Sequence, residues 1–111
     1  MHIREALSFH RRQTSWLHDE TQSVTFNITN QGPSSHELLA FRTDLPDDQL
    51  PLGPDGRINE DALPKVLDTQ TDLTPGIQRS LTVPLSPGRY VPLCNLPGHY
   101  KMGMHTVVTV A

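Results

Sequence analysis

Apolar and polar residues alternate in several short runs of this chain, and this period of two restricts the fold more than any other feature. Residues 24–30 (VTFNITN) place an apolar side chain at every second position, and Asn-Gln-Gly-Pro, a typical turn sequence, begins at Asn30. Residues 81–85 (LTVPL) alternate in the same way. Because successive side chains of a strand point to opposite faces, each run predicts a β-strand with one buried face. Pro84 places the second strand near a sheet edge or a bulge.

Other segments also favour strands. Residues 90–94 (YVPLC) follow a Ser-Pro-Gly turn and predict the return arm of a hairpin with residues 81–85. Residues 105–110 (HTVVTV) are rich in β-branched side chains, which are common in strands. Residues 37–43 (ELLAFRT) predict one strand, and residues 3–16 predict one or two. Short strands between turn signals are typical of a sandwich or barrel, so we expect an all-β sandwich of about seven or eight strands.

One long segment interrupts this pattern. Between Asp44 and Pro75 the chain is rich in Pro, Gly and Asp, and its eight acidic and two basic residues give a net charge of −6. One short helix is predicted at 59–67 (NEDALPKVL), with Asn59 as its N-cap and Pro64 limiting its length. We interpret residues 44–75 as an irregular acidic insertion, which is either a solvated loop or a surface that attracts a cationic partner.

Length and composition exclude several classes of protein. The 111 residues correspond to a single domain spanning 1–111. The chain has no apolar run of about eighteen residues, so no membrane span is expected. Its first thirty residues lack the apolar core of a signal peptide. A net charge of −3 argues against nucleic-acid binding, and the single cysteine excludes an internal disulfide framework and a four-thiolate zinc site.

That single cysteine lies in the most informative stretch, residues 94–104 (CNLPGHYKMGM). Cys94, His99 and Met104 follow one another at a C-x4-H-x4-M spacing, and His36 lies upstream, after a Gly-Pro turn. Thiolate, thioether and imidazole ligands suit copper that cycles between Cu(I) and Cu(II). Two His and one Cys in a plane, with a weak axial Met, form a blue-copper electron-transfer site. Each residue alone is more often an ordinary core or surface residue, so the indication comes from their joint spacing.

The same residues carry a resemblance to a known family. The sequence G-x-Y-x-x-x-C at 88–94, followed by G-H at 98–99, by G-M at 103–104 and by a β-branched strand, resembles the cupredoxins, the plastocyanin- and azurin-like type 1 blue copper proteins. The strand at 24–30 and His36 resemble the family's approach to its first histidine ligand. The loop before the second histidine is longer than in plastocyanins and looks more like that of rusticyanin- and auracyanin-like members.

The resemblance implies a Greek-key β-sandwich with one copper ion at one end. By this match the metal ligands are His36, Cys94, His99 and Met104. The resemblance also implies a small monomeric electron carrier that serves redox partner proteins, such as a cytochrome or a copper oxidase. It further implies a periplasmic or other extracytoplasmic location, with a leader or anchor outside this chain. The match is strong over 23–39 and 81–110 and weak over 1–22 and the acidic insertion.

One departure from the family pattern follows the first histidine, where Glu37 replaces the usual Asn. Hydrogen bonds around the ligands tune a metal site, so this change bears on potential and rigidity rather than on the ligand set. In the family this Asn ties the two ligand loops together, and we hypothesise that Asn95 replaces it through its side-chain amide or its backbone N–H. Met104 is preferred to Met102 as the axial ligand because it follows Gly103, as the family pattern requires.

Other polar and aromatic residues have plainer interpretations. We expect Tyr90 to be a buried structural residue whose hydroxyl binds a loop carbonyl. Met102 is either an ordinary exposed side chain or part of an apolar docking patch around His99. The histidines without a partner at metal-ligand spacing are expected to be solvated; these are His2, His10, His18 and His105.

These observations favour electron transfer as the function. The alternative is an extracytoplasmic copper-handling or tolerance protein, which would deliver or store copper with the same ligands. An enzyme is not expected, because the chain has no H-x-H copper motif, no G-x-S-x-G sequence and no phosphate-binding loop.

Overall fold

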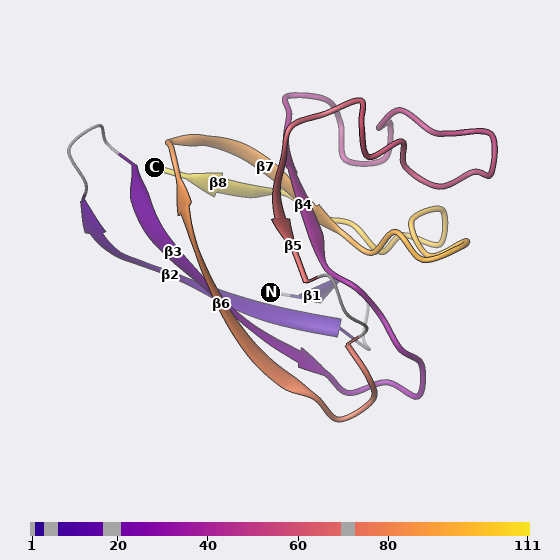
Figure 1. The fold of residues 1–111 in the computed structure, drawn as a ribbon, viewed down its shortest axis with the longest axis horizontal. Helices are drawn as coiled ribbons and strands as arrows, with labels where there is room; N and C mark the ends of the chain where they lie inside the picture. The colour runs from indigo at the N-terminus through magenta and orange to yellow at the C-terminus, as the bar shows by residue number, and fades with distance from the viewer. Residues whose placement is uncertain (1, 4–6, 17–20, 70–72) are drawn as a thin grey trace.

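The chain folds into strands and turns. The computed structural model describes residues 2–3, 7–16, 21–69 and 73–111, with side chains from Thr21 onward. These residues form eight strands in two four-stranded antiparallel sheets, and none of them is helical (Figure 1). The strands are β1 (His2–Ile3), β2 (Leu7–Trp16), β3 (Gln22–Asn30), β4 (Leu39–Arg42), β5 (Lys65–Asp68), β6 (Gln78–Leu85), β7 (Gly88–Leu93) and β8 (Val108–Val110). The predicted all-β class is therefore confirmed.

The first sheet has the strand order β1-β2-β3-β6. The alternation predicted for β3 is confirmed, because Val24, Phe26 and Ile28 are buried while the residues between them are partly or fully exposed. β6 pairs with β3 along almost its whole length. It lies at one end of this strand order, which agrees with the edge position predicted from Pro84.

The second sheet has the order β5-β4-β7-β8. Its two middle strands are almost entirely buried, since residues 39–41 and 90–93 are all shielded from solvent. Strands that are covered on both faces have continuous apolar sequences rather than alternating ones, as residues 39–41 and 90–93 do. The predicted strand at 105–110 is shorter than expected: only β8 pairs regularly, and His105 meets Leu93 in a single bridge.

Side chains of β4 divide between two apolar cores. Ala40 packs with Phe26 of β3 and Val108 of β8 in a core to which both sheets contribute. Leu39 and Phe41 point the other way, as neighbouring residues of a strand must, into a second core. This second core is completed by residues of β7, of the turn after it and of the connection between β4 and β5 (residues 43–64); they are Val91, Leu93, Tyr100, Leu50, Ile58 and Leu63.

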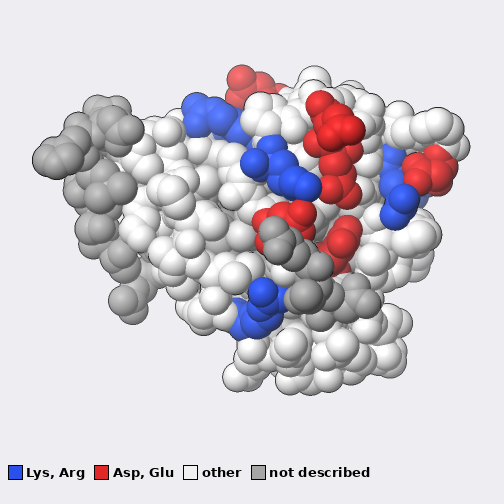
Figure 2. All heavy atoms as spheres, in the orientation of Figure 1, with Lys and Arg blue, Asp and Glu red and all other residues white. Residues whose placement is uncertain are grey.

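The β4–β5 connection is consequently a cover for the second sheet, although its sequence is dominated by charge. Leu50, Ile58 and Leu63 of the β4–β5 connection face the sheet, and most of the charged side chains of the connection face solvent. Figure 2 shows acidic side chains gathered over the half of the molecule that carries this connection, with basic side chains among them.

The predicted helix at 59–67 is wrong. Asn59 accepts a hydrogen bond from the Asp61 amide, as an N-cap does, but the chain makes only a turn before Pro64. From Lys65 it forms β5, which pairs with β4. The structure therefore places a strand inside the segment predicted to be irregular. Pro64 cannot donate a helical hydrogen bond, while its carbonyl accepts from the Arg42 amide and starts this pairing.

The predicted hairpin of β6 and β7 is also wrong. β6 pairs with β3 in the first sheet, whereas β7 pairs with β4 and β8 in the second. The chain turns a corner between the sheets at Ser86, whose carbonyl accepts a 2.6 Å hydrogen bond from the Tyr90 hydroxyl. Arg42 donates to that hydroxyl and to the Pro87 carbonyl. The structural role predicted for Tyr90 is confirmed.

Among the described residues, no helix is long and apolar enough to cross a membrane.

Candidate metal centre

Three metal-binding side chains converge at one end of the second sheet. His36 lies in the connection from β3 to β4, Cys94 directly follows β7, and His99 lies in the turn after it. The two histidine Nδ1 atoms are 3.3 Å apart. The Cys94 sulfur is 3.3 Å from Nδ1 of His99 and 4.0 Å from Nδ1 of His36. The chain thus brings two imidazoles and one thiol, separated by up to 63 residues in sequence, to a single point.

Burial differs among these side chains. Cys94 is fully buried and His36 is 4% exposed, whereas His99 is only partly buried. The first apolar core includes both Cys94 and Met104, so the two sulfur-bearing side chains pack in one cluster. The site therefore has a dry interior side and one histidine that reaches the surface.

His36 is held by a short bridge to the segment before β6. Its amide donates to the Leu73 carbonyl at 3.0 Å, and the Leu73 amide donates back to the His36 carbonyl. Asn30, at the end of β3 and fully buried, donates to the same Leu73 carbonyl at 2.6 Å and to the Ser34 carbonyl at 2.9 Å. The side-chain oxygen of Asn30 also accepts from the Gly32 amide, which closes the turn predicted from the sequence.

The loop at 94–104 is a series of tight turns. The Cys94 amide donates to the Met104 carbonyl at 3.0 Å, and the Met104 amide donates to the His99 carbonyl at 3.2 Å. Gly98 and Gly103 have φ angles of 79° and 99°, a region that suits glycine because it has no Cβ. These bonds and turns bring Cys94, His99 and Met104 together within eleven residues of chain.

The electrostatics of the site favour an uncharged His36 and a stabilised Cys94 sulfur. Burial, and secondarily the nearby His99, lowers the pKa of His36 below its ordinary value. Its Nε2 is buried and has no hydrogen-bond partner among the described residues. The Glu37 amide donates to the Cys94 sulfur at 3.4 Å, which favours negative charge on that atom.

These donors fit a transition-metal ion. Protein-bound metals of this class lie about 2.0–2.3 Å from imidazole nitrogen and thiolate sulfur, so two donors on one ion stand about 3–4 Å apart. The separations of 3.3 to 4.0 Å between the three donor atoms agree with this, and all three lie within 4.8 Å of one another. Two nitrogens and one thiolate suit copper and zinc alike, so geometry alone leaves the identity of the ion open.

Met104 and Met102 lie in different surroundings. Met104 is 4% exposed and packs with Cys94, while Met102 is 59% exposed. The buried methionine is the one that the sequence pattern favours as the fourth ligand.

The structure also contradicts two expectations about the surroundings, one for His105 and one for the Asn95 side chain. His105 is not simply solvated: its Nδ1 lies 2.6 Å from a carboxylate oxygen of Asp47. The side chain of Asn95 does not tie the two ligand loops together, because it pairs with Ile58 and Glu60 of the β4–β5 connection. Asn95 and Tyr100 instead link the loop to that connection. The sequence signals this only through the isolated apolar residues within the acidic insertion, which indicate that part of it packs on the domain.

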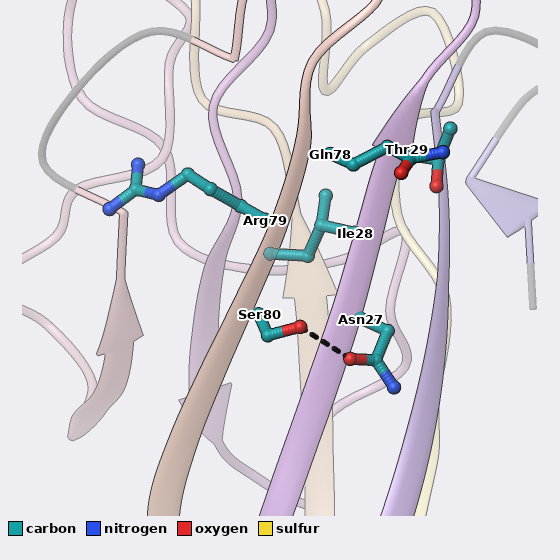
Figure 3. A pocket seen from close by; sticks show the side chains of 6 residues that line it. All are labelled: Asn27, Ile28, Thr29, Gln78, Arg79 and Ser80. Carbon is teal, nitrogen blue, oxygen red and sulfur yellow. Dashed lines mark hydrogen bonds between the residues drawn. The ribbon is translucent and has the colours of Figure 1, made fainter.

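Two hollows on the surface lie outside the donor cluster. One, of about 270 Å³, lies over β3 and β6, where Ser80 donates to Asn27 (Figure 3). None of its lining residues is a His, Cys, Asp or Glu, so it has no metal-binding character. The other, of about 350 Å³, lies between the β4–β5 connection and Asn95, which directly follows Cys94.

The chain was compared with protein-family models, with curated proteins and with solved structures, and no match was found in any of the three. The case for its function therefore rests on the sequence and on this geometry.

Proposed function

We propose that this chain is a mononuclear type 1 copper protein of the cupredoxin kind, which carries single electrons between redox partner proteins. The observation that carries the proposal is the convergence of the Cys94 sulfur with Nδ1 of His36 and of His99. Met104, buried in the same apolar core, is the proposed fourth ligand. When bound, copper supplies one-electron chemistry between Cu(I) and Cu(II).

The proposed fold is a Greek-key β-sandwich with this site at one end. The shared apolar core of the two sheets and the crossing of the chain between them support this topology. A stiff scaffold suits electron transfer because ligands that hardly move when an electron arrives keep the reorganisation small.

The residues of the site have distinct proposed tasks. His36 and Cys94 bind the ion from the buried side, where the surrounding core excludes water. The Glu37 amide stabilises the thiolate of Cys94, and hydrogen bonds of this kind tune a metal site. His99, which is partly exposed, gives the electron a short route to the surface. We propose no substrate chemistry for this site.

Copper handling is the second candidate. It is favoured by Met102, a thioether that is 59% exposed in the same loop as three of the proposed ligands. A soft surface ligand of this kind suits Cu(I) in transit. Both candidates place the protein in the periplasm or another extracytoplasmic space, acting as a monomer with a cytochrome, a copper oxidase or a copper acceptor as its partner.

Adding Cu(II) to the purified protein tests the site. We expect an intense blue or green thiolate-to-copper absorption band, which Cys94→Ser abolishes. Met104→Leu should change the band and the reduction potential, while Met102→Leu, the matched control, should leave both unchanged. A colourless copper complex of the unsubstituted protein would overturn the proposal.

Kinetics separates the two candidates. A carrier should exchange electrons quickly with a cytochrome and retain its copper in the presence of a Cu(I) acceptor. A copper-handling protein should pass Cu(I) to that acceptor readily, and Met102→Leu should then slow the transfer.

A further inference from the structure

Each proposed ligand of the 94–104 loop is followed directly by a residue that is bonded to the β4–β5 connection. Asn95 follows Cys94, Tyr100 follows His99, and His105 follows Met104. We propose that these three are positioning residues, through which the acidic β4–β5 connection fixes the metal-binding geometry of the loop. This inference rests on the proposed function, since it assigns a task to residues around the same site.

Asn95 makes the first of these links. Its side chain is 2% exposed, and its oxygen accepts a 2.8 Å hydrogen bond from the Ile58 amide. Its nitrogen donates to the Ile58 carbonyl at 3.1 Å and to a carboxylate oxygen of Glu60 at 2.8 Å. Three hydrogen bonds from one buried carboxamide fix the backbone immediately after the thiol ligand.

Tyr100 makes the second link. Its hydroxyl donates to the Asp47 carbonyl at 2.6 Å and accepts from the Leu50 amide at 3.1 Å. Its ring is 5% exposed and belongs to the second apolar core, together with Leu50 and Ile58. The residue after His99, the partly exposed histidine ligand, is therefore anchored by both hydrogen bonds and apolar packing.

His105 makes the third link. Its Nδ1 lies 2.6 Å from a carboxylate oxygen of Asp47, and its ring lies 4.9 Å from that of Tyr100. Its backbone also meets Leu93 of β7. Asp47 thus bonds two of the three positioning residues, one through its carbonyl and one through its carboxylate.

These links have a consequence for the metal because a ligand's position depends on its own backbone. Between Asn95 and His105 the loop consists mainly of turns, and Lys101, Met102 and Gly103 are exposed. Partners outside the ligand shell that orient a metal's ligands typically change its affinity by about 10–100-fold. The β4–β5 connection can supply such orientation because Leu50, Ile58 and Leu63 are themselves packed on the second sheet.

Two buried tyrosines provide a matched test. Tyr100→Phe and Tyr90→Phe each remove a hydroxyl with two partners from a residue that is at most 5% exposed. Tyr90 lies in β7 and shares the first apolar core with Cys94 and Met104, but its hydroxyl is bonded to Ser86 and Arg42 rather than to the β4–β5 connection. In the copper-loaded protein we expect Tyr100→Phe to release the metal to excess chelator at least about tenfold faster and to shift the absorption band. Tyr90→Phe should change neither, so equal effects of the two variants would overturn the inference.

A second pair of variants changes neither the ligand loop nor a fully buried side chain. Asp47→Ala removes the carboxylate that binds His105, whereas Asp55→Ala removes one that is paired with Arg57 in the same connection. Both aspartates are partly exposed, so both variants should fold. Faster copper release is expected for Asp47→Ala alone, and unchanged release in both variants would contradict the role of the connection.

Amide hydrogen exchange of the metal-free protein keeps this inference separate from the proposed function. Tyr100→Phe should speed exchange of the Leu50 and Met104 amides at least about tenfold, and Tyr90→Phe should not, whichever metal the site binds. If the unsubstituted protein gives no copper–thiolate band but this difference is found, the proposed function fails and the positioning role stands. If the band is present and exchange is the same in both variants, the positioning role fails.

Discussion

The hydroxyl of Tyr90 donates a 2.6 Å hydrogen bond to the carbonyl of Ser86, four residues earlier, across the corner where the chain leaves one sheet for the other. Arg42 of β4 lies over the same ring, 5.5 Å from its centre, and donates to the same hydroxyl. One side chain therefore fixes both the corner and the neighbouring strand, which explains why β6 and β7 separate rather than pair.

Tyr90→Phe should lower the free energy of unfolding by about 1 kcal/mol, the usual net value of a hydrogen bond whose partners can reach water. Urea unfolding of the metal-free protein measures this. Phe keeps the buried ring, so the apolar contribution is retained. A loss as large as that expected for a buried cavity, about 3 kcal/mol, would show that the ring packing had also changed.

Asn30 and Asn27 lie on the same strand but differ in their surroundings. Asn30 is fully buried and has three hydrogen bonds, including one to the Leu73 carbonyl beside His36, while Asn27 is exposed. Asn30→Ala should cost about 2–4 kcal/mol because it leaves buried partners unsatisfied. Asn27→Ala should cost under about 0.5 kcal/mol, as exposed substitutions usually do. Thermal unfolding of both variants checks the difference, and equal losses would contradict this role for Asn30.

The hydrogen bond to the Cys94 sulfur comes from the backbone of Glu37, not from its side chain. Glu37→Asn introduces the residue that the cupredoxins, the family this sequence resembles, usually have after the first histidine. It should therefore leave the copper–thiolate band of the copper-loaded protein in place. Glu37→Pro removes the amide hydrogen and should shift the band and the reduction potential. If the Asn variant shifts the band as far as the Pro variant does, the side chain rather than the backbone tunes the site.

The strands were predictable where local pattern and burial agree. β3 alternates because only one of its faces is buried, and residues 90–93 of β7 do not alternate because both faces of the strand are covered there. The helix predicted at 59–67 does not form because pairing of β5 with β4, some 25 residues away in sequence, overrides the local preference for helix. The prediction of a hairpin was wrong because a Ser-Pro-Gly turn can connect two paired strands or carry the chain from one sheet to the other, and its sequence does not distinguish the two.

The candidate site was predictable in part for a related reason. Cys94, His99 and Met104 lie in one short loop, so their spacing in the sequence indicates a metal site. His36 offers a second imidazole and follows a turn. The contacts of Asn95 with Ile58 and of Tyr100 with Leu50 join residues from distant parts of the chain. Neither pair belongs to a motif, and only the folded chain brings its members together.

The metal-free protein should lose stability as the pH falls below about 6.5, the ordinary pKa of histidine. The pKa of His36 is lowered in the folded state, so between its folded and unfolded pKa values the unfolded chain binds more protons. Stability therefore rises with pH through this window and falls as the solution is acidified. Urea unfolding at several pH values should show a steeper decline for the unsubstituted protein than for His36→Gln. Parallel curves would contradict the lowered pKa.

Gly98 and Gly76 allow the geometry of the ligand loop to be tested apart from stability. Their φ angles are 79° and 84°, and an added Cβ would meet no atom within 4 Å at either position. Replacement by Ala should cost about 1 kcal/mol in each case, because only backbone strain is introduced. Gly98 directly precedes His99, whereas Gly76 lies in the turn before β6. Both variants should therefore lose similar thermal stability, but only Gly98→Ala should change the absorption band and the affinity of the copper-loaded protein. A band that is unchanged in Gly98→Ala, with both variants equally destabilised, would show that the backbone at this turn does not control the histidine ligand.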